Sequence, residues 1–323
     1  MSGSARSRQQ RRDRDLRVST GQFRRTRGEA ARPEGSADKR RLSGVTLGDA
    51  LARATSRLAE AGIESARLEA ELLLSKACDD CARALLYAEL DRELSEEQET
   101  AFERQVARRE KREPLAYVLG EWGFRRLTLK TDRRALIPRP ETEVVVERAL
   151  THIYGLDAPE VLDVGTGTGA IALAIADEVP GARVTAIDSS PGALALAREN
   201  LNLTGINGRV RLVEQDLTSG LGEGQFDLVV SNPPYVEPEE LETLQPEVRD
   251  WEPHVALVAK GATEAVARAA TEALRPGGWL VLETSATKGE RVEQLLAGLG
   301  YEQVTITPDL AGRDRVVEGR WRG

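Results

Sequence analysis

Apolar residues recur three or four positions apart over residues 46–113, which is the period of amphipathic helices. In the first stretch they are Leu47, Ala50, Leu51, Ala54, Leu58 and Ala61. Gly62 follows as a helix stop. The same period continues over 68–77, 82–90 and 95–112, and the last stretch opens with the capping-box residues Ser95 and Gln98. The pattern predicts a small helical bundle without a candidate catalytic residue.

The pattern changes over residues 114–137. Pro114 and Gly120 interrupt it, and the apolar runs Leu115–Val118 and Phe124–Lys130 have the composition of short strands. We therefore expect a β-hairpin linker in this part of the chain.

Beyond Pro140, short apolar runs alternate with helical stretches. The predicted strands are 160–164, 183–188, 210–215, 226–231, 279–284, 303–307 and 315–320. The predicted helices are 141–153, 170–179, 191–202, 262–275 and 288–299. This alternation indicates βαβ units around a mostly parallel sheet. The loop between the last two strands is too short for a helical crossover, so these strands must pair antiparallel. A parallel sheet that ends in such a hairpin is typical of class I methyltransferases.

A glycine-rich turn follows the first of these strands, and it consists of Gly165, Thr166, Gly167, Thr168 and Gly169. Glycine permits a tight reversal and close approach of the backbone to a ligand. The turn also satisfies the dinucleotide fingerprint, so it is weakly specific by itself. Asp163 precedes it, and a carboxylate there would repel a pyrophosphate. It could instead accept hydrogen bonds from the turn or bind the ammonium group of S-adenosyl-L-methionine.

Two more carboxylates close the next two strands. Asp188 stands where a carboxylate binds the two ribose hydroxyls of a nucleotide-like cofactor, and its alternative role is to cap the following helix. Asp216 and Leu217 are placed to contact an adenine, or else form an ordinary turn at a strand end. The predicted cofactor is S-adenosyl-L-methionine.

The segment that closes the fourth strand consists of Asn232, Pro233, Pro234 and Tyr235. Two successive prolines remove two N–H donors and leave carbonyl groups as acceptors. The Asn232 side-chain oxygen and the Pro233 carbonyl can each accept a hydrogen bond from a planar NH2 group, and Tyr235 can stack on its plane. These residues predict methyl transfer to nitrogen, catalysed mostly by positioning. The alternative is a rigid turn.

The composition of the chain gives no indication of a membrane span or a secretory signal. Apolar residues make up 40% of the 323 residues, and no apolar run approaches the about 18 residues of a membrane span. The arginine-rich start has no apolar stretch after it, unlike a secretory signal. We expect a cytoplasmic protein without a membrane partner.

Residues 1–41 contain 13 Lys/Arg and 5 Asp/Glu, a net charge of +8, whereas the whole chain carries −8, so the remainder carries −16. An acidic body disfavours a broad nucleic-acid surface. We expect residues 1–44 to be a disordered basic tail, with contact to RNA or a ribosome as the alternative. Since Met1 is the only methionine, a further hypothesis is that translation starts near Leu42 or Val45.

Cys78 and Cys81 have the spacing of a redox or zinc site. A structural zinc ion needs four ligands, and the only two histidines, His152 and His254, are far away in the sequence. We therefore interpret the cysteines as small residues near a helix end and expect no metal.

On these motifs the chain closely resembles the bacterial protein-(glutamine-N5) methyltransferases that modify peptide chain release factors, the PrmC/HemK family. The resemblance runs from about Thr46 to Trp321. The segments that carry it are 113–120, 136–143, 163–170, 231–235 and 309–315. It implies a helical N-terminal domain that engages the release factor and a catalytic domain that binds S-adenosyl-L-methionine. The implied substrate is the glutamine of the Gly-Gly-Gln loop of class I release factors.

The resemblance also implies roles for single residues. By position, the glycine turn 165–169, Asp188, Leu217 and Asn232 belong to the cofactor site, and residues 232–235 bind the glutamine. Three residues of a family motif, which are Arg139, Thr142 and Glu143, are interpreted as the floor of the cofactor pocket, with hinge and helix-cap roles as the alternative. The implied domains are a tail (1–44), a helical substrate-recognition domain (45–113), a linker (114–137) and a catalytic domain (138–323).

Two departures from the family pattern stand out. The segment 282–285, which reads Leu-Glu-Thr-Ser, differs from the usual strand end of the family, and we expect it to contact no residue assigned to catalysis. Leu217 replaces an aromatic residue that some members place on the adenine, which predicts weaker stacking.

Three alternatives stay open at this point. An enzyme that methylates an exocyclic amine of a nucleic-acid base could use the same acceptor segment, but such enzymes usually need a basic surface or a target-recognition domain. A non-catalytic protein that binds S-adenosyl-L-methionine and docks on the translation machinery would not need residues 232–235. A dehydrogenase is disfavoured by Asp163.

Overall fold

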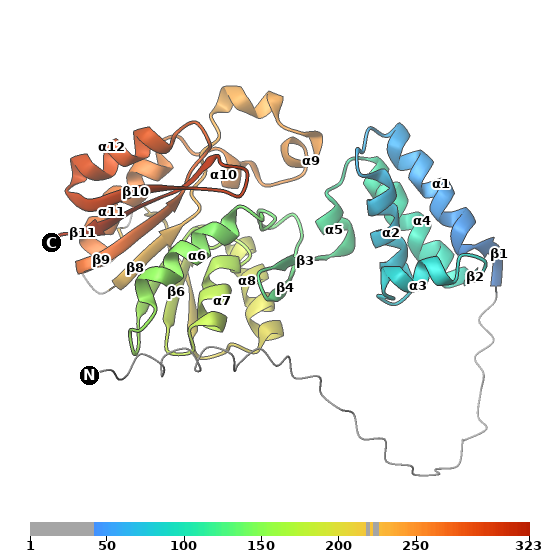
Figure 1. Cartoon of the computed structure of the whole chain (residues 1–323), viewed down its shortest axis with the longest axis horizontal. Helices are drawn as coiled ribbons and strands as arrows, with labels where there is room; N and C mark the ends of the chain where they lie inside the picture. Colours follow the sequence, from blue (N-terminus) through green and yellow to red (C-terminus); the bar gives the residue numbers. More distant parts are fainter. Residues whose placement is uncertain (1–41, 218–219, 222–225) are drawn as a thin grey trace, which may run out of the picture. The chain divides into compact units, whose positions relative to one another are not determined.

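The computed structural model describes residues 42–217, 220, 221 and 226–323 (Figure 1). The predicted basic tail lies outside the described residues except for residues 42–44. These belong to strand β1 (Leu42–Thr46), which pairs antiparallel with β2 (Glu93–Ser95). The sequence assigns residues 42–44 to the tail, but in the structure they join the edge of the helical part.

The predicted helices of the N-terminal part are confirmed. They are α1 (Leu47–Glu60), α2 (Ala66–Ala77), α3 (Arg83–Ala88) and α4 (Glu96–Glu110). The Thr46 side chain caps α1 by accepting a hydrogen bond from the Asp49 amide at 3.1 Å. The capping box of Ser95 and Gln98 begins α4, as its sequence predicts. The apolar stripes of these helices meet in one buried core.

One secondary-structure prediction for the following segment is wrong. Residues 115–118 form a helix, α5 (Leu115–Leu119), and not a strand. The Pro114 carbonyl accepts hydrogen bonds from the Tyr117 and Val118 amides, and Gly120 ends the helix with a φ of +77°. Because a short apolar run is buried on several sides in either conformation, its pattern does not distinguish the two.

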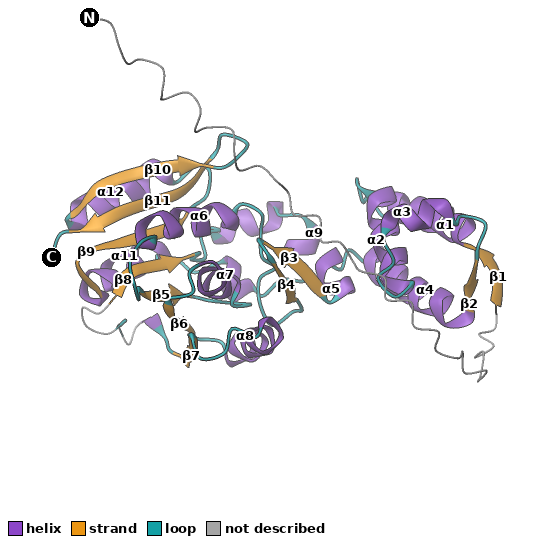
Figure 2. Cartoon of the chain, turned by 60° about the horizontal axis from the view of Figure 1, so that its bottom comes forward, coloured by secondary structure: helices purple, strands orange, loops and turns teal. Residues whose placement is uncertain are grey.

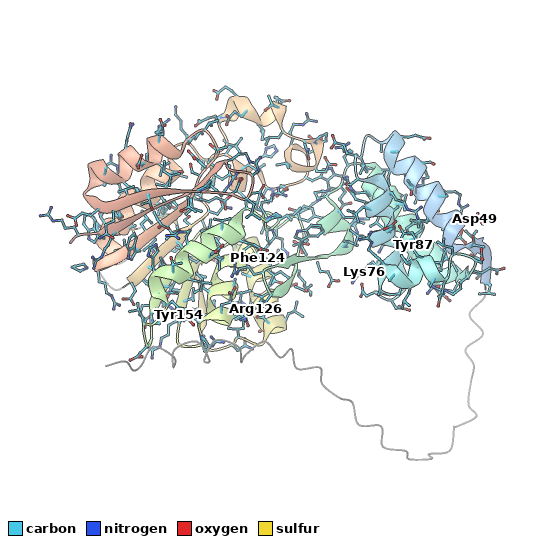
Figure 3. All side chains as sticks on the ribbon, viewed as in Figure 1. Asp49, Lys76, Tyr87, Phe124, Arg126 and Tyr154 are labelled. Carbon is cyan, nitrogen blue, oxygen red and sulfur yellow. The ribbon has the colours of Figure 1, made fainter. Side chains whose placement is uncertain are left out.

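A hairpin follows, and it is formed by β3 (Glu121–Phe124) and β4 (Leu127–Lys130). The Phe124 ring, whose position is labelled in Figure 3, is fully buried in the core of the catalytic part. The hairpin is therefore packed against that core, and it is shorter than the predicted linker.

The predicted fold class is confirmed, because a seven-stranded sheet forms the centre of the remaining chain. Its strands are β5 (Glu160–Val164), β6 (Arg183–Asp188), β7 (Val210–Glu214), β8 (Phe226–Ser231), β9 (Leu274–Glu283), β10 (Tyr301–Pro308) and β11 (Asp314–Trp321). Their order is β10-β11-β9-β8-β5-β6-β7. The pairs among β5 to β9 are parallel, whereas β11 is antiparallel to both β9 and β10.

Helices cover both faces of this sheet (Figure 2). One core contains residues of α6 (Thr142–Ile153), α7 (Ala170–Glu178) and α8 (Pro191–Thr204), and the other contains residues of α11 (Ala262–Ala273) and α12 (Gly289–Leu299). Successive strand residues alternate between the two cores, as Val161 and Leu162 do. The strands are apolar on both faces because both faces are covered.

A segment between β8 and α11 has short helices that the sequence pattern does not predict. They are η2 (Pro238–Thr243), α9 (Pro246–Arg249) and α10 (His254–Leu257). Contacts with arginine side chains from residues 109–133 hold this segment in place. Glu247 accepts from Arg112 at 2.7 Å and pairs with Arg109 at 2.9 Å, and the Arg133 guanidinium lies 4.1 Å from the centre of the Trp251 ring.

Within the described ranges, no helix is both long and apolar enough to cross a membrane.

Candidate active site

A cavity of about 320 Å3 lies at the carboxyl ends of the parallel strands. The strand order reverses here, because β5 has β6 on one side and β8 on the other. Open α/β sheets bind ligands at such a reversal. The cavity is lined by four groups of residues that the sequence places at strand ends, which are 164–168, 187–190, 215–217 and 231–234.

The glycine turn is held against β6 by its own backbone. The Gly165 and Thr166 amides donate to the Ile187 carbonyl at 2.9 and 3.0 Å. Gly165 and Gly167 have φ values of +73° and +56°, which side chains with a Cβ rarely adopt. The turn therefore presents bare backbone to the cavity.

Asp163 lies under this turn and not on the cavity wall. Its Oδ2 accepts from the Thr166 hydroxyl at 2.5 Å and from the Ala172 amide at 3.2 Å. The side chain is fully buried, and burial raises its pKa to about 7. No described group forms a hydrogen bond with Oδ1. Asp163 therefore accepts hydrogen bonds from the turn, which is the first of its two predicted roles. The second role, contact with a methionine ammonium group, stays a prediction.

Asp188 lines the cavity with its carboxylate fixed from two sides. Oδ2 accepts from the Gly167 amide and Oδ1 from the Ser190 amide, both at 2.9 Å. Each carboxylate oxygen has a further lone pair. The cap of α8 is Ser190, whose hydroxyl accepts from the Ala193 amide at 3.2 Å. Asp188 is thus held in one orientation and keeps acceptor capacity for two hydroxyl groups.

Asp216 and Leu217 line the same cavity, beyond the end of β7. Leu217 is partly buried against the core that contains Ile187. Together with Ile187 it gives the cavity an apolar wall beside the Asp188 carboxylate, which is the chemistry that a ribose with an attached adenine requires.

The acceptor segment is tied directly to the glycine turn. The Ser231 hydroxyl, at the end of β8, donates to the Val164 carbonyl at the end of β5 at 2.7 Å and is buried. Asn232, Pro233 and Pro234 follow and line the cavity. The two predicted signatures therefore occupy neighbouring strand ends in one cavity.

Tyr235 is displaced from its three predecessors. It does not line the cavity but a neighbouring one of about 250 Å3, together with Pro234. Its hydroxyl donates to Glu283 Oε1 at 3.3 Å. Burial, followed by the nearby Glu283 carboxylate, raises the pKa of Tyr235.

The three residues assigned to the pocket floor have different environments. Arg139 and Thr142 line the cavity, and the Arg139 guanidinium donates to Glu252. Glu143 is not part of the lining. Its carboxylate accepts from the Arg125 amide at 2.8 Å and so joins α6 to the turn between β3 and β4.

The expectation that residues 282–285 contact no site residue is wrong. Glu283 ends β9 and is buried, and it accepts from Thr142 at 2.7 Å as well as from Tyr235. Burial raises its pKa to about 7, although the Thr142 hydrogen bond and the charge of Arg315 act in the opposite direction. The sequence contained one signal for this contact. Glu283 lies near the end of a predicted strand, and the ends of parallel neighbouring strands meet at the same edge of a sheet, where residues 232–235 also lie.

Among the described residues there is no group of three or more His, Cys, Asp or Glu side chains that could hold a metal ion. Cys78 directly follows α2 and is buried, and its burial raises the pKa of the thiol. It packs in the helical core with Cys81 at its margin. This placement agrees with the interpretation of two small residues near a helix end.

Two family models match the chain. One, described as the PrmC N-terminal domain, matches residues 49–120, and the other, described as the methyltransferase small domain, matches residues 142–248. A release factor glutamine methyltransferase from Geobacter sulfurreducens is 44% identical over 269 residues, which are 81% of this chain and 92% of that protein. The chain belongs to the release factor glutamine methyltransferase family. A second member, from Cereibacter sphaeroides, is 43% identical over 280 residues, with 84% of this chain and 97% of that protein covered.

Among solved structures, the protein-(glutamine-N5) methyltransferase (release factor-specific) from Alicyclobacillus acidocaldarius is 29% identical to this chain. The similarity covers 58% of this chain and 95% of that one, with a TM-score of 0.35. Membership of the release factor glutamine methyltransferase family confirms the predicted family, enzyme class and cofactor, S-adenosyl-L-methionine. The predicted domain limits and the roles of single residues stay predictions.

Proposed function

We propose that this chain transfers a methyl group to the side-chain amide nitrogen, N5, of the glutamine in the Gly-Gly-Gln motif of class I peptide chain release factors. The observation that carries the proposal is the buried bond from Ser231 to Val164, which brings the cofactor turn and the acceptor segment to one cavity. When bound, S-adenosyl-L-methionine supplies an electrophilic methyl group on a sulfonium.

The residues around the cavity fit this cofactor. The glycine turn offers backbone that a ligand can approach closely, and Asp188 offers two oriented acceptors for the ribose hydroxyls. Ile187 and Leu217 offer an apolar wall for the adenine, with Asp216 next to it. We assign the methionine end to the region between the turn and Asn232.

The acceptor segment would hold the glutamine amide by its two hydrogens. The Asn232 side-chain oxygen accepts one and the Pro233 carbonyl accepts the other, since prolines at 233 and 234 have no N–H to compete. This arrangement directs the nitrogen toward the methyl group and favours the positive charge that develops on nitrogen during transfer. The methylated amide then loses a proton readily without a dedicated base. We assign Tyr235 to the edge of this site.

The helical part, residues 45–113, is proposed to recognise the release factor, and the enzyme is proposed to act in the cytoplasm. Neither role involves nucleic acid directly. A basic tail that contacts RNA stays a hypothesis about residues outside the described ranges.

The test is transfer of a labelled methyl group to a purified class I release factor. The matched acceptor is the same factor with Gln→Ala in its Gly-Gly-Gln motif, and stripped tRNA and rRNA serve as parallel acceptors. We expect label on the wild-type factor and none on the mutant. Label on RNA alone would replace the proposal by methylation of a base amine. No label on any acceptor, with cofactor binding intact, would favour the non-catalytic alternative.

A further inference from the structure

Thr142 lies within hydrogen-bond distance of two site residues, and the direction of its two hydrogen bonds is restricted. Its Oγ1 lies 2.7 Å from Glu283 Oε2 and 3.4 Å from Asn232 Nδ2. A threonine hydroxyl has a single hydrogen, and an ionised carboxylate only accepts. When Glu283 is ionised, the hydrogen therefore points to Glu283, and Thr142 can only accept from Asn232.

This constraint decides which end of the Asn232 amide faces the cavity. The NH2 and oxygen ends of an asparagine side chain have nearly the same shape, so packing alone does not distinguish them. A partner that only accepts selects the NH2 end. The oxygen end, Oδ1, is then turned away from Thr142 and is available to a donor in the cavity that Asn232 lines.

We propose that Glu283 is a positioning residue that orients the Asn232 amide through Thr142, so that Oδ1 and not the NH2 group meets the substrate amide. The inference rests on the proposed function, because the donor that Oδ1 would meet is the glutamine NH2. With the amide reversed, two NH2 groups would face each other and the hydrogen bond would be lost.

The fold explains why Glu283 can do this. Ser231 is in register with Leu282 on the neighbouring parallel strand, so Asn232, which follows β8, and Glu283, which ends β9, are the next residues along the two chain segments. Thr142 is the first residue of α6 and contacts both of them, and Thr142 and Glu283 are buried. Because both side chains are buried, the direction of the hydrogen bond between them is determined mainly by their own donors and acceptors.

Burial raises the pKa of Glu283 to about 7, and three neighbouring groups act against burial by stabilising the ionised form. Its two oxygens each accept one hydrogen bond, from Thr142 and from the Tyr235 hydroxyl. Arg315, on the antiparallel neighbour β11, adds a positive charge, while Glu141 at the start of α6 adds an opposing negative one. A neutral carboxyl would need an acceptor of its own, and Thr142 would be the one within reach.

We call the two hydrogen bonds that connect Glu283, Thr142 and Asn232 the relay. Two substitutions interrupt it at different residues. Glu283→Gln keeps the shape but leaves one oxygen for two hydroxyl donors, Thr142 and Tyr235, so the Thr142 hydroxyl no longer has an acceptor that fixes its direction. Thr142→Val keeps the shape and removes the hydroxyl. Thr142→Ser restores the hydroxyl and is the conservative rescue. Glu318→Gln is the matched control, because it neutralises another buried carboxylate, on β11, whose partners are Arg148 and His152.

The first readout is the side-chain amide of Asn232 itself. The chain has four asparagines, so selective 15N labelling gives few side-chain NH2 signals, and Asn232→Ala identifies the relevant one. With S-adenosylhomocysteine bound, we expect Glu283→Gln and Thr142→Val to move this signal. Thr142→Ser and Glu318→Gln should leave it close to its wild-type position. An unmoved signal in both relay variants would overturn the inference.

The second readout is kinetic. We expect kcat/KM for the release factor to fall about 10- to 100-fold in Glu283→Gln and Thr142→Val, which is the range for one hydrogen bond to a developing charge. The affinity for S-adenosylhomocysteine should stay near that of the wild type. Wild-type kinetics in both variants would overturn the relay and leave the proposed function standing. If the wild-type enzyme labels no release factor, the proposed function fails, and the amide signal still decides whether Glu283 orients Asn232.

Discussion

Replacing Asp188 by asparagine should weaken cofactor binding without unfolding the protein. In the structure both carboxylate oxygens accept backbone hydrogen bonds at 2.9 Å, from Gly167 and from Ser190. Asparagine has one oxygen, so its NH2 group must face one of these two N–H donors. That bond is lost, and so is one of the two acceptors proposed for the ribose hydroxyls.

The size of the effect follows from these contacts. A hydrogen bond to a charged acceptor contributes about 1.5–3 kcal/mol, and the cofactor loses one such bond directly. The lost hydrogen bond to Gly167 or Ser190 also loosens the backbone there, and cofactor binding must then order this backbone at a cost in free energy. We expect a total of about 2–3 kcal/mol, which is a Kd about 30- to 150-fold higher.

Calorimetric titration with S-adenosylhomocysteine measures this change, because the product analogue binds without turnover. Asp177→Asn is the control, since Asp177 lies on α7 and pairs with Arg126 at 2.8 Å outside the cavity. Its Kd should match that of the wild type. A Kd for Asp188→Asn within about threefold of the wild-type value, together with a lowered melting temperature, would refute the ribose role. The carboxylate would then serve only to hold the turn.

Three further predictions concern other residues. Asn232→Ala should abolish methyl transfer yet leave the Kd for S-adenosylhomocysteine within a few-fold, as radiolabel and titration assays will measure. Because burial raises the pKa of Glu283 to about 7 and the relay needs its carboxylate, kcat/KM should rise as pH increases through about 7, and Glu283→Gln should flatten this rise. Burial acts to raise the pKa of Glu318, but the ion pairs with Arg148 and His152 outweigh it and lower the pKa to about 2. Its stabilisation, of the order of 3 kcal/mol, is therefore complete above pH about 4.5 and is lost as pH falls toward 2, which denaturation with and without Glu318→Gln will show.

Most of the catalytic fold was predictable because its signals are local. Each parallel strand is covered on both faces and therefore appears as a continuous apolar run, as Val161 and Leu162 show by packing into opposite cores. The glycine turn and the proline pair identify the ends of β5 and β8, where ligands bind. The antiparallel end of the sheet followed from the short loop before Arg315.

The rest depends on contacts between residues that are distant in sequence. The run Leu115–Val118 is a helix because Pro114 and Gly120 delimit one turn, and its apolar residues carry no period that would indicate this. The short helices after Tyr235 are held by side chains from elsewhere, such as Arg112 on Glu247. Glu283 was missed as a contact of the site because its partners Thr142 and Tyr235 are 141 and 48 residues away.

The order in which the sheet is assembled has a consequence for synthesis on the ribosome. Thr142 lies near the start of the catalytic part, whereas its partner Glu283 and the β11 strand beside it lie near the end. A nascent chain that has exposed the glycine turn and residues 232–235 still lacks β9, and once β9 emerges its edge is unpaired until β11 arrives. The acceptor segment is thus present long before the groups that orient it. Ribosome-arrested chains that expose residues only to about 300 should therefore be inactive, and the enzyme should become competent only when its last strand has left the exit tunnel.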